Sequence, residues 1–280
     1  MNAMAHDSTT IRFALVADPQ YADADPKSGR HYRRGKTHLE ALVTQLNDIP
    51  QLDFVFNLGD IVNGNAEGDF PMMIDIFKQC RHPVKHTVGN HDLVRQTAAD
   101  AAAVCGIDSF FFEFAIGGFR FIALDSMDES IFSPPGSPRL ARAQKLLEAH
   151  PRKWGYNGQL SPERMDWLER LLDDAASCGQ RAIVLTHIPI LIEAACPDTV
   201  AWNNDEMLLL IDRHPNVIAW LAGHEHAGGC AVRNGVLHKC VKGNCETERP
   251  TASIVTLAPD HIELSAIGDE TAFVHAFGNQ

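Results

Sequence analysis

The chain is organised around Asp60, an acidic residue that directly follows an apolar segment. Residues 52–58 contain mostly aliphatic and aromatic side chains and are predicted to form a buried β-strand. Gly59 then permits a turn that lets Asp60 project from the end of this strand. A carboxylate at such a position is costly to desolvate unless a cation compensates its charge. We therefore predict that Asp60 binds metal, and that it bridges two metal ions.

Apolar runs rich in β-branched residues alternate with helical patterns along the chain. This alternation predicts an α/β fold with strands at 11–17, 52–58, 84–88, 119–124, 182–185 and 217–221. Apolar residues at helical spacing predict helices at 37–46, 69–79 and 161–178. Asp69 and Ser161, each followed closely by proline, are the expected N-caps of the last two helices. From Gly235 onwards the pattern is typical of short strands and turns.

Composition and charge limit the class of protein. With 280 residues, 45% hydrophobic and 21% charged, the chain is predicted to form one globular domain over 11–280 after a disordered start at 1–10. No segment has the pattern of a membrane span, and the first residues lack the apolar core of a secretory signal. A net charge of −12 argues against a nucleic-acid partner. Seven cysteines without metal-type spacing favour reduced thiols and a cytoplasmic location.

Polar side chains recur where the predicted strands end. Besides Gly59-Asp60, the series comprises Asp18-Pro19-Gln20, Gly89-Asn90-His91, Thr186-His187-Ile188-Pro189 and Gly223-His224-Glu225-His226. Any one of these motifs alone is more often an ordinary turn or a surface pair. Five of them in this order, each after an apolar run, are difficult to explain by packing. Carboxylate, amide and imidazole ligands without thiolate are suited to Mn²⁺, iron or Zn²⁺, and they are not the ligand set of a typical structural zinc site.

This ordered series resembles the motifs of the calcineurin-like metallophosphoesterases, which are D-x-H, G-D-x-x-D, G-N-H-[DE], a further histidine and G-H-x-H. The resemblance extends from about residue 11 to residue 227 and implies a four-layer α/β/β/α sandwich with a dinuclear metal centre at the edge of two sheets. It further implies one ion held by Asp18, Gln20, Asp60 and His226, and another held by Asp60, Asn90, His187 and His224. His91 is implied to be a general acid near the leaving group.

The implied metal centre defines a type of reaction. Two cations about 3.5–4 Å apart that share a carboxylate lower the pKa of a bridging water and neutralise charge on a phosphoryl group. We therefore expect hydrolysis of a phosphoester or a phosphoanhydride by metal-activated hydroxide.

Gln20 departs from the family pattern, which usually has histidine at this position. Its amide oxygen makes the shell of one ion richer in oxygen and favours Mn²⁺ over iron or Zn²⁺. Asp18-Pro19-Gln20-Tyr21-Ala22-Asp23 resembles one branch of the family, the manganese-dependent ADP-ribose/CDP-alcohol diphosphatases. Further stretches similar to that branch are Arg30-His31-Tyr32-Arg33-Arg34, Tyr156-Asn157-Gly158-Gln159-Leu160-Ser161, Val200-Ala201-Trp202-Asn203 and His224-Glu225-His226-Ala227-Gly228-Gly229. The resemblance implies a small nucleoside diphosphate substrate.

Several residues in and beside these stretches are predicted to contact the substrate. Arg33 and Arg34, with Arg30 and Lys36 beside them, would bind its distal phosphate. Tyr32, Tyr156 and Trp202, together with His31, would stack on the base or line its pocket, and Asn203 is a further expected contact. Basic residues also commonly cover solvated faces, and aromatic residues are commonly half-buried packing. The insert at about 126–160 is long for a connection, and is expected to be a lid beside the site or a plain surface helix.

Two other functions are compatible with the same residues. One is a phosphodiesterase or phosphatase with the same metal centre, acting for example on cyclic nucleotides. The other is a binding or scaffold protein in which Gln20 and Asn63 mark a degenerate site. The complete set of remaining ligands argues against the scaffold.

Asn63 is the second departure, because the family usually has aspartate here. It supplies no negative charge to raise the pKa of His91, so leaving groups that need little protonation should be preferred. Asn63→Asp is therefore expected to raise kcat for an alkyl phosphodiester more than kcat for ADP-ribose. Equal effects on the two substrates would contradict this explanation.

Overall fold

The computed structural model describes residues 10–64, 66–150 and 153–278, and the expected disordered start at 1–10 lies outside them except for Thr10. Strands in these ranges form two six-stranded sheets. The first sheet, in the order β12-β11-β10-β1-β2-β3, contains β1 (Ile11–Val16), β2 (Phe54–Asn57), β3 (Val84–His86), β10 (Ala252–Leu257), β11 (His261–Ile267) and β12 (Phe273–Ala276). The second, in the order β4-β5-β6-β7-β9-β8, contains β4 (Phe112–Ile116), β5 (Phe119–Ala123), β6 (Arg181–Leu185), β7 (Val217–Ala222), β8 (Gly229–Arg233) and β9 (Val236–Cys240).

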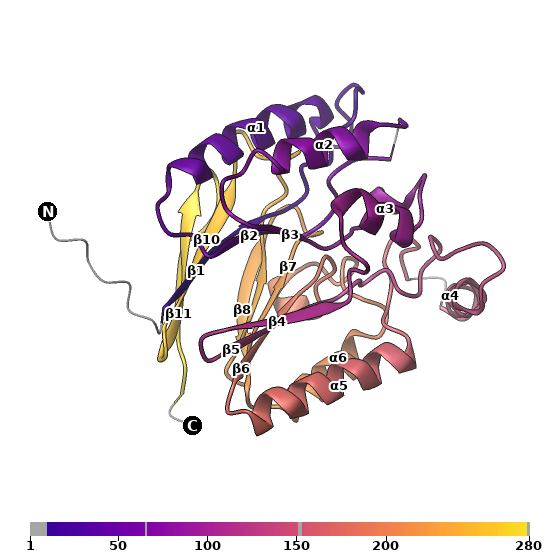
Figure 1. Cartoon of the computed structure of the whole chain (residues 1–280). Coiled ribbons are helices and arrows are strands. Elements are labelled where there is room, and N and C mark those ends of the chain that lie inside the picture. Colours follow the sequence, from indigo (N-terminus) through magenta and orange to yellow (C-terminus); the bar gives the residue numbers. More distant parts are fainter. Residues whose placement is uncertain (1–9, 65, 151–152, 279–280) are drawn as a thin grey trace, which may run out of the picture.

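Helices cover the outer faces of the two sheets, so the molecule has four layers (Figure 1). The first sheet is covered by α1 (Tyr32–Asp48) and α2 (Asp69–Phe77), and the second by α5 (Pro162–Ser177) and α6 (Asn204–Asp212). The remaining helices are α3 (Ala98–Cys105), α4 (Pro138–Ala149) and two short 3-10 turns, His91–Leu93 and Ile192–Ala194. This arrangement confirms the predicted α/β/β/α sandwich. Within the described ranges, no helix combines the length and apolar character needed to cross a membrane.

The sequence of β1 shows why the sheets lie in the interior. Alternate side chains point to opposite faces of a strand. Phe13 and Leu15 face the second sheet, whereas Ala14 and Val16 belong to the apolar cluster on the helix side. Both faces of β1 are therefore buried, which explains its nearly continuous apolar run. Phe13 contacts Phe121 of the second sheet edge to face, with ring centroids 5.5 Å apart.

The direction of the strands determines where a site can form. β1, β2 and β3 are parallel to one another, as are β5, β6, β7 and β9. Side chains that follow several parallel strands are thereby brought to a common edge. The antiparallel strands β10, β11 and β12 extend the first sheet on the side of β1 away from β2.

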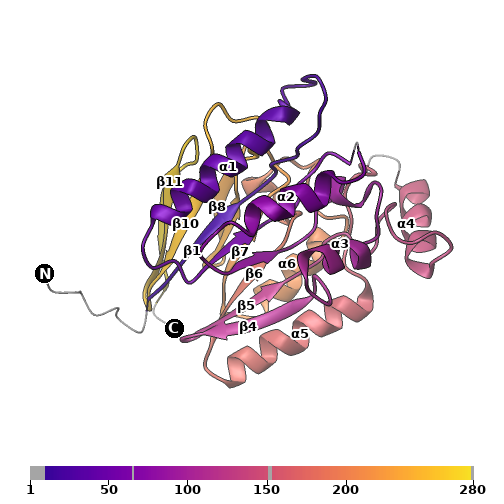
Figure 2. The same cartoon turned by 45° about the horizontal axis from the view of Figure 1, so that its top comes forward.

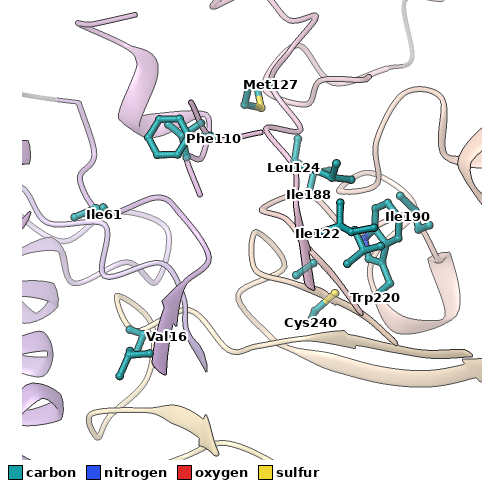
Figure 3. Close-up of a cluster of buried hydrophobic side chains, with 14 of the residues drawn as sticks. Val16, Ile61, Phe110, Ile122, Leu124, Met127, Ile188, Ile190, Trp220 and Cys240 are labelled. Carbon is teal, nitrogen blue, oxygen red and sulfur yellow. The ribbon is translucent and has the colours of Figure 1, made fainter. Parts of the chain in front are cut away.

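A buried apolar cluster supports the loops at this edge. Figure 3 shows members of it from both halves of the chain, including Val16 and Ile61 on one side and Leu124, Ile188 and Trp220 on the other. Tight packing of this kind fixes the backbone from which polar side chains project.

Two details of the helices differ from the sequence-based expectation. α1 begins at Tyr32, not at residue 37, because the buried residues Tyr32 and Gly35 add a turn ahead of the apolar residues. Asp69 is not the N-cap of α2. Gly68 occupies that position with φ of 91°, and Asp69 lies in the first helical turn, where its carboxylate complements the helix dipole.

The segment around residues 126–160 leaves the sheets and returns to them. Glu129 and Gln159 pair through two backbone hydrogen bonds of 3.0 Å, which close its base. α4 begins after Ser137, whose side chain accepts a hydrogen bond from Leu140 N, and projects away from the layered body (Figure 2). The segment therefore contains a capped surface helix. Its returning part, close to Gln159, lies beside the edge at which the parallel strands end.

Gly35 on α1 allows the helix to contact the loop after β1. A Cβ atom at this position would lie 1.8 Å from Pro19 O, which is far inside van der Waals contact. Any side chain here would therefore push α1 and the Asp18–Gln20 loop apart.

We expect Gly35→Ala to lower the free energy of unfolding by about 1–3 kcal/mol, because overpacking outweighs the higher helix propensity of alanine. Denaturant-induced unfolding measures this change. Gly118→Ala is the matched control, since a Cβ at Gly118 meets nothing within 4 Å. Similar unfolding free energies for the two variants would contradict the prediction.

Candidate metal centre

The seven predicted metal ligands lie together at the edge where the parallel strands end. They are Asp18 and Gln20 after β1, Asp60 after β2, Asn90 after β3, His187 after β6, and His224 and His226 after β7. Hydrogen bonds and close ion-pair contacts connect all seven into one group. Six of them are buried, and His224 is half-buried.

The backbone at this edge has an unusual conformation. Seven non-glycine residues in the described chain have positive φ, and four of them are Asp18, Gln20, Asp60 and His224. Such conformations cost of order 1–3 kcal/mol each and occur mainly where function requires them. Hydrogen bonds from Asp18 N to Gly59 O (3.2 Å) and from Gln20 N to Asp60 O (2.8 Å) hold two of these loops together.

The His187 cluster contains Asp60, Asn90, His187 and His224. Three possible ligand atoms lie near His187 Nε2: Asp60 Oδ2 at 3.4 Å, Asn90 Oδ1 at 3.3 Å and His224 Nδ1 at 3.1 Å. The four side chains therefore surround a single small space.

Outer hydrogen bonds decide which nitrogen of each ring faces this space. His187 Nδ1 lies 2.8 Å from Leu58 O, which can only accept, so the neutral ring carries its lone pair on Nε2. His224 Nε2 lies 2.9 Å from Asn157 Oδ1, whose amide nitrogen donates to two backbone carbonyls, so its lone pair is on Nδ1. Two lone pairs and a carboxylate face one another, and a proton or a metal cation must relieve their repulsion.

The charges in this cluster shift the pKa values accordingly. Burial opposes a charge on His187, but the carboxylate of Asp60 raises the His187 pKa to about 9. Burial and the neighbouring His187 lower the pKa of His224 well below its ordinary value. Burial also opposes ionisation of Asp60, yet His187 holds the Asp60 pKa below its usual range. Without a metal ion, a proton on His187 thus supplies the positive charge next to Asp60.

The His226 cluster contains Asp18, Gln20 and His226. His226 Nε2 lies 3.3 Å from Asp18 Oδ1, and Gln20 Nε2 lies 3.4 Å from Asp60 Oδ2. Asp18 Oδ1 is buried and makes no hydrogen bond with the described residues. Although burial opposes it, the Asp18 carboxylate raises the pKa of His226 well above its ordinary value. This cluster also fits a cation, and Asp60 adjoins both clusters.

His91, the predicted general acid, lies directly beside Asp60. Its backbone N–H donates to Asp60 Oδ1 at 2.8 Å. Burial lowers the pKa of the His91 imidazole, although Asp60 opposes this change. Asn63, its predicted partner, is half-buried, and its backbone N–H donates to Tyr21 O at 2.8 Å.

Asp92 holds the loop that carries His91. Its Oδ1 accepts the backbone N–H groups of Ile61 and Val62 at 2.8 and 3.1 Å, and its Oδ2 accepts that of Gly89 at 3.0 Å. Through these three hydrogen bonds Asp92 has a structural role.

The predicted substrate-binding residues fall into three settings. Arg33 is exposed and pairs with Asp23 and Asp25 at 2.5 and 3.0 Å, while Arg34 donates to Thr247 O at 2.9 Å. Tyr32, the first residue of α1, and Trp202 are buried, and the indole N–H of Trp202 donates to Trp154 O at 3.0 Å. Asn203 is half-buried, and its side chain donates to Leu160 O.

Tyr156 is in a different position, because its ring contacts a predicted metal ligand. Its centroid lies 5.6 Å from that of His224, and Trp154 stacks on it with centroids 5.6 Å apart and an interplanar angle of 27°. Trp154 is 48% exposed, which is unusual for so large an apolar side chain. Two aromatic rings therefore extend from the ligand cluster to the surface.

Three residues at the site were not singled out from the sequence. Asn157 hydrogen-bonds to His224, and Cys245 and Glu246 contact His226. Arg30, which the sequence indicated only as a candidate phosphate-binding residue, contacts Glu246. A signal for two of them was present, since Gly243-Asn244-Cys245-Glu246 follows β9 as the other motifs follow their strands.

The fold and the two clusters form a candidate metal centre at the common edge of the two sheets. The family model described as calcineurin-like phosphoesterase matches residues 11–228. The chain belongs to this family.

Several relatives match over nearly their whole length. A protein of Arabidopsis thaliana is 30% identical over 92% of this chain and 94% of its own, and one of Homo sapiens is 27% identical over 91% and 90%. Both are named manganese-dependent ADP-ribose/CDP-alcohol diphosphatase. The crystal structure of a dimetal phosphatase from Danio rerio has a TM-score of 0.88 and 23% identity, and covers 96% of this chain and all of that one. This similarity shows the fold.

Proposed function

We propose that this protein hydrolyses the phosphoanhydride bond of ADP-ribose or CDP-alcohol type compounds and releases AMP or CMP. The observation that carries the proposal is the pair of ligand clusters that meet at Asp60, with unshared electron pairs directed inward. The names of relatives that match more than nine-tenths of the chain support the choice of substrate.

In this proposal the His226 cluster and Asp60 hold one divalent ion, and the His187 cluster, which includes Asp60, holds the other. When bound, the ions supply Lewis-acid activation of water and neutralise charge on the phosphoryl oxygens. The oxygen-rich His226 cluster, with Gln20 in place of an imidazole, favours Mn²⁺. Leu58 O and Asn157 keep the imidazoles of His187 and His224 in the orientation that ligation needs.

His91 would protonate the leaving group. Burial lowers the pKa of His91, so its imidazole holds a proton less readily than an exposed histidine does. This favours a leaving group that needs little protonation, and a nucleoside monophosphate, with a second pKa near ~6, is such a group. Asn63 favours the same kind of leaving group, because it supplies no negative charge that would raise the pKa of His91.

Tyr156 and Trp154 are the residues that we assign to the nucleobase. Tyr156 contacts His224, and Trp154 stacks on Tyr156 and also lines a cavity of about 240 Å³ together with Asn157 and Trp202. A base stacked there would place its diphosphate toward the ligand clusters. For Tyr32, Arg33, Arg34, Trp202 and Asn203 we propose a supporting role in the walls of the site, because their polar groups are engaged or they are buried.

We further propose a cytoplasmic location. The seven cysteines, all free, support it, because thiols remain reduced in that compartment.

Trp154→Ala is expected to raise KM for ADP-ribose about tenfold, since stacking on a base contributes about 1–3 kcal/mol. The hydrogen bond from Trp202 goes to the backbone oxygen of Trp154 and is retained. Steady-state kinetics with bis-(p-nitrophenyl) phosphate, which lacks a nucleobase, provide the control. An equal loss on both substrates would mean that the variant distorts the site and that Trp154 does not bind the base.

A substrate panel tests the proposed function. Protein loaded with Mn²⁺ is compared on ADP-ribose, CDP-choline, 2′,3′-cyclic AMP and bis-(p-nitrophenyl) phosphate, with Asp60→Asn as the inactive control. We expect the highest kcat/KM for one of the two diphosphates, with AMP or CMP as product. Preference for the cyclic nucleotide would assign the site to a phosphodiesterase, and fewer than one tightly bound ion per chain would support a scaffold.

A further inference from the structure

We propose that Glu246 is a positioning residue that orients His226 for the ion of the His226 cluster, and that Arg30 holds Glu246 in place. Glu246 Oε1 lies 2.7 Å from His226 Nδ1 and 3.4 Å from Arg30 Nε. This inference rests on the proposed metal centre and adds two residues that do not touch the ion.

The contact with Glu246 fixes the chemical state of the imidazole. A carboxylate can only accept, so His226 presents its N–H to Glu246 from Nδ1. The lone pair of a neutral ring is then on Nε2, the atom that lies 3.3 Å from Asp18 Oδ1. The hydrogen bond thus directs the ligating nitrogen inward and increases its basicity, as carboxylates behind ligating histidines do.

Arg30 also contacts Glu246 Oε1, the oxygen that accepts from His226. The side chains of Arg30 and Glu246 are 34% and 33% exposed, so both are partly shielded from water. Residues 30 and 246 are far apart in sequence, and the contact requires the loop before α1 to meet the loop after β9. A carboxylate held by both the guanidinium and the imidazole has little freedom to rotate.

The His226 cluster depends on this support more than the His187 cluster does. Gln20 directs its amide nitrogen toward Asp60 at 3.4 Å, and its oxygen accepts from the Cys245 thiol at 3.3 Å. Gln20 must therefore turn its amide before it can ligate, and a neutral amide is a weaker ligand than imidazole. His226 is then the strongest nitrogen donor available to this ion.

Cys245 suggests an alternative arrangement. Ligand atoms of His226, Cys245 and Glu246 lie within 4.8 Å of one another, a grouping that could itself bind a soft cation. Such an ion would require His226 Nδ1 to lose its proton, in competition with the 2.7 Å hydrogen bond to Glu246. Cys245 Sγ is farther from the same nitrogen, at 3.6 Å, and burial raises the pKa of its thiol. The geometry favours the hydrogen bond.

Calorimetric titration of the metal-free protein with Mn²⁺ tests the proposal. We expect two ions to bind to the wild-type chain. In Glu246→Gln and Glu246→Ala one of the two should bind about 10–100-fold more weakly, while the other is unchanged. Glu248→Gln is the matched control, because this nearby carboxylate is 82% exposed and contacts Arg34, not a ligand. It should bind both ions as the wild type does.

Glu246→Asp separates position from charge. It keeps the negative charge but is one methylene shorter, so we expect the weaker binding to persist. Wild-type affinity in this variant would overturn the positioning role in favour of a simple charge effect. Circular dichroism of the metal-free variants checks that they fold, and the near-isosteric glutamine variant serves if the alanine variant does not.

The remaining outcomes are distinct. No Mn²⁺ binding by the wild type would overturn the proposed metal centre itself. Two normal sites in the wild type and in both Glu246→Gln and Glu246→Ala would overturn only the role of Glu246. A Zn²⁺ titration in which the wild type takes up a further ion that Cys245→Ser loses would replace the hydrogen-bond assignment with a third metal site.

Discussion

The carboxylate of Asp60 is the group on which the rest of the site depends. Its Oδ1 accepts the backbone N–H of His91 and so fixes the loop after β3, while its Oδ2 lies between Gln20 and His187. One side chain therefore links three loops and both ligand clusters. Its buried negative charge also raises the His187 pKa to about 9, which shows how strongly this position favours a cation. Removal of the charge would leave the surrounding nitrogen donors without a common partner.

The packed sheets allow this arrangement to persist. Positive φ angles at Asp18, Gln20, Asp60 and His224 and mutually facing lone pairs are all unfavourable locally. The aromatic and aliphatic core between the sheets, together with the cluster in Figure 3, compensates by fixing the strands that carry these residues. The fold thus maintains a set of ligands before any ion binds, and binding needs little rearrangement of the backbone.

The fold and the grouping of the ligands could be predicted because they follow from local patterns. Each ligand comes directly after an apolar run, and parallel strands bring such positions to one edge. The supporting contacts depend on side chains that meet only in the folded chain. Arg30 and Glu246 are an example, as is the hydrogen bond from His224 to Asn157. The pairing of Arg33 with Asp23 and Asp25 could not be predicted from the sequence either, because it does not indicate that these charged side chains meet.

The position of β10 has a consequence for how the protein is made. β1 pairs with β2 on one side and with β10 on the other, and residues 252–257 of β10 are synthesised long after residues 11–16 of β1. During translation β1 therefore has an open edge with apolar faces until β10 leaves the ribosome. Such non-local pairing slows folding and exposes the nascent chain to aggregation. Chaperone binding during this interval would protect the strand from which Asp18 and Gln20 later project.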